Sequence, residues 1–120
     1  MTLHQHLPIY KLAVDLLDLA VDLTRNMPRD FKASLGAEIR SELIRLIVLI
    51  GRANAATDKV PHITELLEHL QVAELLLRLC HGKRFISLAQ WSRAAELTAT
   101  IGKQAGGWRK SSRNAATPVA

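Results

Sequence analysis

Aliphatic side chains recur at three- and four-residue steps through four stretches of the chain, and this spacing limits the possible folds more than any other feature. An α-helix turns once every 3.6 residues, so the spacing places the apolar side chains of each stretch on one face. Leu, Ile, Val and Ala supply most of the 48% hydrophobic content, and aromatic residues only 4% of the chain, which favours helix packing over a sheet sandwich. The pattern predicts helices at about 8–26, 28–56, 61–81 and 88–110.

Prolines and one polar pair mark the starts of these helices. Pro8, Pro28 and Pro61 suit first-turn positions, where an amide hydrogen is not needed. Ser87 followed by Gln90 matches a capping box, in which each side chain accepts a hydrogen bond from a backbone N–H of the first turn. These features divide the chain into helices joined by short connections.

Short connections force consecutive helices to run in opposite directions. We therefore expect a single all-α domain over residues 1–110, an antiparallel up-down-up-down four-helix bundle. Residues 111–120 are small and polar, and we expect them to form a flexible C-terminal tail.

The composition also predicts where the protein works. The apolar run 46–51 is far shorter than the roughly 20 residues that span a bilayer, and residues 1–7 do not resemble a secretory signal. Cys80 is the only cysteine, so no intrachain disulfide can form. We expect a cytoplasmic protein that does not enter a membrane.

The second and third predicted helices carry more apolar side chains than one face can hold. No helix is central in a bundle of four, so a second apolar face indicates a contact with another subunit. We therefore expect a homo-oligomer. The expected interface residues are Ile44, Val48, Leu49, Val72, Leu75 and Leu79.

Positive charge is concentrated in the C-terminal part of the chain, where Glu96 is the only acid against eight basic residues. The net charge is +5, and the first predicted helix has a more acidic character, so the charge is unevenly distributed. This asymmetry predicts a polyanionic partner, RNA or DNA, bound through its phosphate backbone. The expected contacts are Arg78, Lys83, Arg84, Arg93, Lys103, Arg109, Lys110 and Arg113.

Four of these cations, at positions 103, 109, 110 and 113, share one arc of the last predicted helix and its continuation on a helical wheel, whereas Lys83 and Arg84 lie in the loop at the opposite end. We expect Trp108 to anchor the end of the bundle. A basic face that only keeps the protein soluble remains the alternative to a phosphate-binding stripe.

No residue set has the spacing of an active site. His62, Glu65 and His69 share a helix face, but a di-iron bundle would need a Glu-x-x-His step on two helices, and no second copy exists. Cys80 continues an apolar seam, and His81 beside it points about 100° away, so core packing is expected rather than nucleophilic chemistry. We expect no enzyme, cofactor or metal; a metal-dependent bundle enzyme is the remaining alternative.

Several short segments resemble the accessory variability determinant (Avd) proteins of diversity-generating retroelements. They are the run 27–36 (MPRDFKASLG), the stretch 75–79 (LLLRL), the cap 86–90 (ISLAQ) and the ending Ile101-Gly102 followed by 106–110 (GGWRK). The resemblance covers about residues 7–110. It implies a homopentameric barrel of four-helix bundles that binds nucleic acid and the element's reverse transcriptase, and supports cDNA synthesis from a template-repeat RNA during mutagenic retrohoming.

A related family, the four-helix-bundle proteins encoded in intervening sequences of 23S ribosomal RNA genes, shares this architecture. Its arginine pair and its Asn-Ile-Ala-Glu-Gly-like run are not evident here, because residues 51–55 (GRANA) are only loosely similar. We therefore favour the Avd family. The alternative function is a ribosome- or protein-binding adaptor that docks through its acidic first helix.

Overall fold

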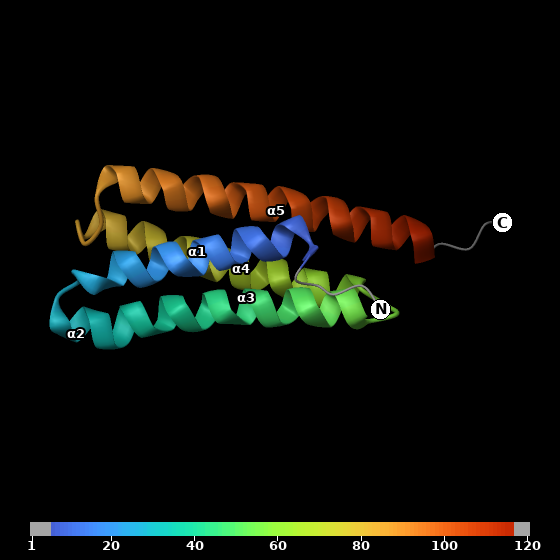
Figure 1. The fold of residues 1–120 in the computed structure, drawn as a ribbon, viewed down its shortest axis with the longest axis horizontal. Coiled ribbons are helices and arrows are strands. Elements are labelled where there is room, and N and C mark those ends of the chain that lie inside the picture. Colours follow the sequence, from blue (N-terminus) through green and yellow to red (C-terminus); the bar gives the residue numbers. More distant parts are fainter. Residues whose placement is uncertain (1–5, 117–120) are drawn as a thin grey trace.

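Long helices make up nearly all of the part of the chain that the computed structural model describes, residues 6–116. The elements are α1 (Pro8–Arg25), α2 (Arg29–Phe31), the π-helical segment η2 (Lys32–Gly36), α3 (Ala37–Ala55), α4 (Val60–Gly82) and α5 (Leu88–Ala116). Figure 1 shows the long helices lying side by side along a molecule that measures 57 × 23 × 20 Å.

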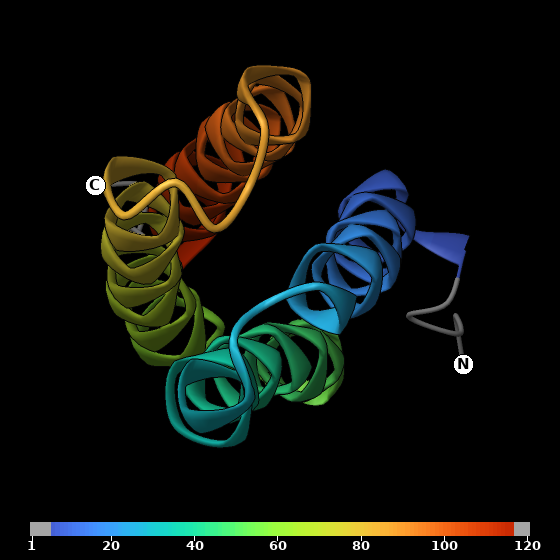
Figure 2. The same cartoon turned by 90° about the vertical axis from the view of Figure 1, so that its left-hand side faces the viewer.

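Each long helix packs against two neighbours. α1 contacts α3 and α5, and α4 contacts the same two helices from the other side. Figure 2 shows this arrangement end-on, with consecutive helices joined by short connections and therefore antiparallel. The all-α four-helix bundle predicted from the apolar spacing is confirmed.

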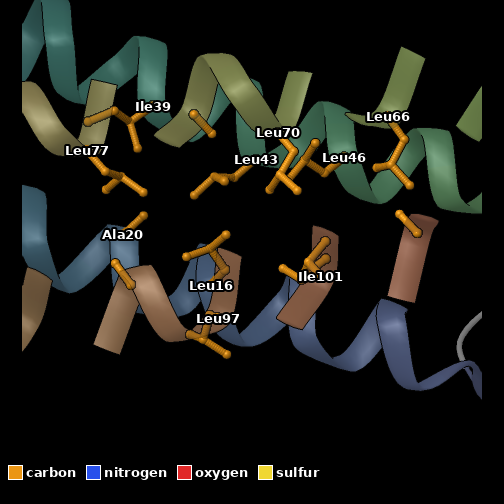
Figure 3. Packing of buried hydrophobic residues seen from close by; sticks show 14 of the residues in the cluster. Leu16, Ala20, Ile39, Leu43, Leu46, Leu66, Leu70, Leu77, Leu97 and Ile101 are labelled. Atoms are coloured by element: carbon orange, nitrogen blue, oxygen red, sulfur yellow. The ribbon is translucent and has the colours of Figure 1, made fainter. Parts of the chain in front are cut away.

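Aliphatic side chains from all four long helices form the core, as Figure 3 shows. The largest fully buried side chains are Leu16, Ile39, Leu43, Leu46, Leu49, Ile50, Ile63, Leu66, Leu77, Cys80 and Ile101. Cys80 therefore occupies the packing position that the sequence predicted, and burial raises the pKa of its thiol. Leu49 was wrongly assigned to the oligomer interface, because it is buried within its own bundle with no exposed surface.

The second predicted helix is not regular throughout. Its first residues form α2, and the chain then passes through the wider turn of η2 before α3 begins. Gly36 ends this turn against Thr24 of α1, where an added Cβ would lie 3.3 Å from the threonine side chain. Arg40 reinforces the contact by donating a hydrogen bond from Nη1 to Thr24 Oγ1 at 3.1 Å. The small residue thus lets the end of α1 lie close to the start of α3.

The last helix is longer than predicted. Residues 111–116 continue α5 rather than forming a tail, so the boundary placed at Lys110 was wrong. Alanine and arginine are good helix formers, and no proline or left-handed residue interrupts this segment. The remaining part of the expected tail, 117–120, lies outside the described residues.

Two polar devices fix the helix ends. The capping box at the start of α5 is confirmed: the Ser87 N–H donates to Gln90 Oε1 at 3.0 Å, and the Gln90 N–H donates to Ser87 Oγ at 3.1 Å. At the end of α3, the Lys59 ammonium donates to the carbonyl oxygens of Ala53, Asn54 and Ala56 at 2.9–3.0 Å. A cation there also interacts favourably with the negative end of the helix dipole.

Removal of one core side chain should show how much the bundle depends on this packing. Leu70 is 2% exposed and packs against Gly102 of α5, so Leu70→Ala should lower the free energy of unfolding by about 2–5 kcal/mol. Its exposed neighbour provides the control, because Gln71→Ala should change stability by less than about 0.5 kcal/mol. Urea denaturation followed by circular dichroism measures both values; equal effects would contradict the described core.

Candidate nucleic-acid interface

The eight predicted phosphate contacts do not form one continuous basic surface, because they are separated along the length of the bundle. Lys103 and Lys110 are exposed on the outer face of α5. Arg84 lies in the connection that precedes α5. With a rise of 1.5 Å for each helical residue and the length of the connection added, Arg84 is about 30 Å from Lys103 along the bundle. The cations therefore form two groups, one along α5 and one at the end of the bundle where α4 meets α5.

The α5 group consists of Lys103, Arg109, Lys110 and Arg113. Arg109 is half-buried, and its Nη1 donates to Thr64 Oγ1 of α4 at 3.4 Å, so it helps to hold the two helices together. Lys110 and Arg113 are exposed. These side chains leave a basic outer face on the C-terminal half of α5.

Trp108 lies beside this group, half-buried against the hydrophobic core. Its ring also lines a hollow of about 600 Å³ with Thr57, Asp58 and Lys59 of the α3–α4 connection. The expectation that this tryptophan anchors an end of the bundle agrees with both contacts.

Arg93 does not fit the predicted role. Its Nη1 lies 3.6 Å from Glu96 Oε2, and it lines a hollow together with Asp15, Asp18 and Asp22 of α1. Four carboxylates near one guanidinium make the surroundings unfavourable for a phosphate. The helical period places Arg93 on one face of α5 and the three aspartates on one face of α1, but the sequence could not show that these two charged faces would meet.

The second group lies at the opposite end of the molecule from the C-terminus of α5. Arg78, Lys83 and Arg84 are all exposed there. Arg84 has a positive φ of 62°, a left-handed conformation that disfavours residues with a Cβ. Its N–H donates to the His81 carbonyl at 3.0 Å, and the Phe85 N–H donates to the Cys80 carbonyl at 2.9 Å. These bonds form a Schellman motif that ends α4.

Four residues at this end were not among the predicted site residues. Phe31 of α2 pairs with Phe85 of the α4–α5 connection, with ring centroids 4.8 Å apart, although 54 positions separate them in the chain. Arg29 and Lys32 are exposed at the same end of the bundle as Lys83 and Arg84, because the α1–α2 and α4–α5 connections of an antiparallel four-helix bundle lie at one end. Figure 2 shows the two connections on the end that faces the viewer. We call this region the basic end; it consists of Arg29, Lys32, Lys83, Arg84, Phe31 and Phe85.

The outer faces of α3 and α4 carry exposed apolar side chains, as the second apolar face in the sequence predicted. The predicted interface residues that remain exposed are Ile44 (51%), Val48 (41%), Val72 (41%), Leu75 (65%) and Leu79 (44%). Val14 and Val21 of α1, which the sequence analysis did not single out, are also exposed. In the described part of α5, one large hydrophobic residue is exposed, Leu88.

The histidine and glutamate face of α4 makes contacts within the bundle. His69 Nδ1 lies 2.6 Å from Glu42 Oε2 of α3, and Glu65 Oε1 accepts a hydrogen bond from Arg45 at 3.3 Å. His62 is not part of these contacts. Within residues 6–116, no group of three or more His, Cys, Asp or Glu side chains is arranged to hold a metal ion. The polar cluster therefore joins α3 to α4.

Architecture and surface together define a class: an all-α four-helix bundle with exposed apolar faces and two groups of cations. Across the described helices, none combines the length and the apolar character needed to cross a bilayer. A family model described as bAvd-like matches residues 5–112, and the chain belongs to this family. The match supports the resemblance to Avd proteins that the short sequence segments indicated. No match was found among curated proteins.

Replacement of the strained arginine should stabilise the protein. Glycine adopts a positive φ without steric cost, so Arg84→Gly should raise the free energy of unfolding by about 0.5–1 kcal/mol. The matched control is Lys83→Gly, at φ −87°, which should give no such gain because that backbone conformation suits any residue. Urea denaturation tests both variants; a loss of stability in Arg84→Gly would mean that the guanidinium itself stabilises the turn.

Proposed function

We propose that this chain is a non-catalytic accessory protein of a diversity-generating retroelement, which binds nucleic acid and partners the element's reverse transcriptase in mutagenic retrohoming. The observation that carries the proposal is the bAvd-like family match over residues 5–112. The partnership with the polymerase rests on that family membership. The binding of nucleic acid has independent support from the charge of the surface.

The outer face of α5 carries exposed cations at a regular spacing. Lys103 and Lys110 are exposed and seven residues apart, which places them on the same face about two turns from each other. Arg113 extends this face by one further turn. Cations at this spacing suit successive phosphates of a polynucleotide, and each neutralised phosphate releases counterions.

The exposed apolar surface supports a proposal of self-association. Five exposed aliphatic side chains on the outer faces of two adjacent helices are costly in water, and burial against a second copy would remove that cost. We propose a homo-oligomer, a pentamer as the Avd resemblance implies. A ring would repeat each basic group once per subunit and so present many weak phosphate contacts together.

Charge reversal on α5 tests the nucleic-acid proposal. Lys103→Glu with Lys110→Glu should weaken binding to single-stranded RNA and lower the slope of log affinity against log salt by about 1.4, or 0.7 for each lost phosphate contact. Fluorescence anisotropy with a labelled oligonucleotide measures both quantities.

The control for this pair keeps the same net charge. Lys11→Glu with Arg52→Glu reverses two exposed charges on α1 and α3 and also lowers the net charge from +5 to +1. We expect this control to retain the wild-type salt slope. If both pairs behave alike, the response reports net charge and not a binding face.

A charged residue in the apolar surface tests self-association. Leu75 is 65% exposed in the isolated bundle, so Leu75→Glu should leave the monomer folded but dissociate the oligomer, because a carboxylate would be buried without a partner. Gln104→Glu, at an exposed position of α5 away from the apolar faces of α3 and α4, should not dissociate it. Sedimentation velocity compares the two variants. A monomeric wild-type protein would contradict the proposal.

A further inference from the structure

Phe31 lies at the basic end with much of its ring open to solvent. Residues 28–34 are all exposed, so this part of the chain projects from the bundle. The Phe31 side chain is 40% exposed, and its ring contacts Phe85 at a centroid distance of 4.8 Å and an interplanar angle of 44°. One side of the ring is thus supported by the protein, and the exposed part is available to a flat, apolar partner.

Four cations lie close to this aromatic pair in the chain. Arg29 and Lys32 flank Phe31 in the chain, and Lys83 and Arg84 immediately precede Phe85. Among residues 6–116, no carboxylate forms a salt bridge with any of these four side chains. Asp30 is the single acid within these two short segments. The two segments that carry the rings therefore hold four cations against one acid.

The backbone at Arg84 adds a second observation. A left-handed position at a helix end favours glycine, yet an arginine with an exposed side chain occupies it. Local strain of this kind is often found at binding sites. The π-helical segment η2, a type of distortion that is also frequent at functional sites, directly follows Phe31.

We infer that the basic end binds unpaired nucleotides of a single strand, with one base stacked on the exposed face of Phe31 and the neighbouring phosphates held by Arg84, Arg29 and Lys83. Base stacking on an aromatic ring combined with phosphate-binding cations is how proteins hold single strands. A duplex would meet only the cations, because the faces of its bases are covered by their neighbours. This inference rests on the proposed function and assigns it a second contact, separate from the lysines of α5.

Substitution of Phe31 distinguishes stacking from charge. Phe31→Leu removes the aromatic face and keeps an apolar side chain, so it should weaken binding of a 12-nucleotide oligouridylate by roughly fivefold or more. Binding of a fully paired RNA duplex of the same length should stay unchanged. Phe31→Tyr keeps the ring and should retain wild-type affinity for both probes. Circular dichroism of each variant verifies that the bundle is folded.

A photocrosslink provides a second readout that does not depend on affinity. An oligonucleotide containing 5-bromouridine should crosslink to the peptide that carries Phe31, and Arg84→Gln should reduce the yield.

The outcomes separate the two proposals. If the wild-type protein binds neither probe at low salt, the proposed function fails. If it binds both probes and Phe31→Leu binds them as tightly as wild type, the inference about the basic end is overturned while the proposed function stands. The duplex probe carries a base-free hairpin loop at each end so that no terminal base pair is open; equal weakening of both probes would then also overturn it, since the bases inside a duplex are already stacked on their neighbours.

Discussion

Leucine and isoleucine side chains from four helices meet in one shared core, and their burial decides which residues remain for any other purpose. Leu16, Leu43, Leu66 and Ile101 come from different helices and are each less than 2% exposed. Once these stripes face inward, the helical period fixes every other residue on a flank or an outer face. Leu49 and Ile44 illustrate the consequence: both looked like surplus apolar residues, yet the first completes the core and the second is exposed.

The ends of the helices carry the most distinctive features. A capping box starts α5, and a Schellman motif with Arg84 in a left-handed conformation ends α4 a few residues earlier. These hydrogen bonds fix both ends of the connection of residues 83–87. The contact between Phe85 and Phe31 packs this connection against α2. Hydrogen bonds at these helix ends thus fix the backbone that carries the exposed Lys83 and Arg84.

The positions of the charged side chains on the folded protein could be predicted only in part from the sequence. The excess of cations in the C-terminal part is a property of the sequence, and Lys103 and Lys110 do lie on one outer face. Arg93 obeys the same helical period but faces the aspartates of α1, because α1 and α5 are neighbours that close the bundle. The predicted phosphate contacts did not include Arg29 of α2 and Lys32 of η2, because these residues are distant in the chain from the C-terminal cations; the antiparallel order of the helices places them at the same end of the bundle as Lys83 and Arg84.

The sequence by itself determined the helical class, the order and direction of the four helices, the capping box and most of the core, because all of these depend on spacing within one segment. It also contained the segments that mark the bAvd-like family. Only the tertiary structure decided which charged faces meet, which apolar residues remain exposed and which aromatic rings pair. These properties depend on the packing of helices that are distant in the chain, and no local pattern encodes the rotation of one helix against another.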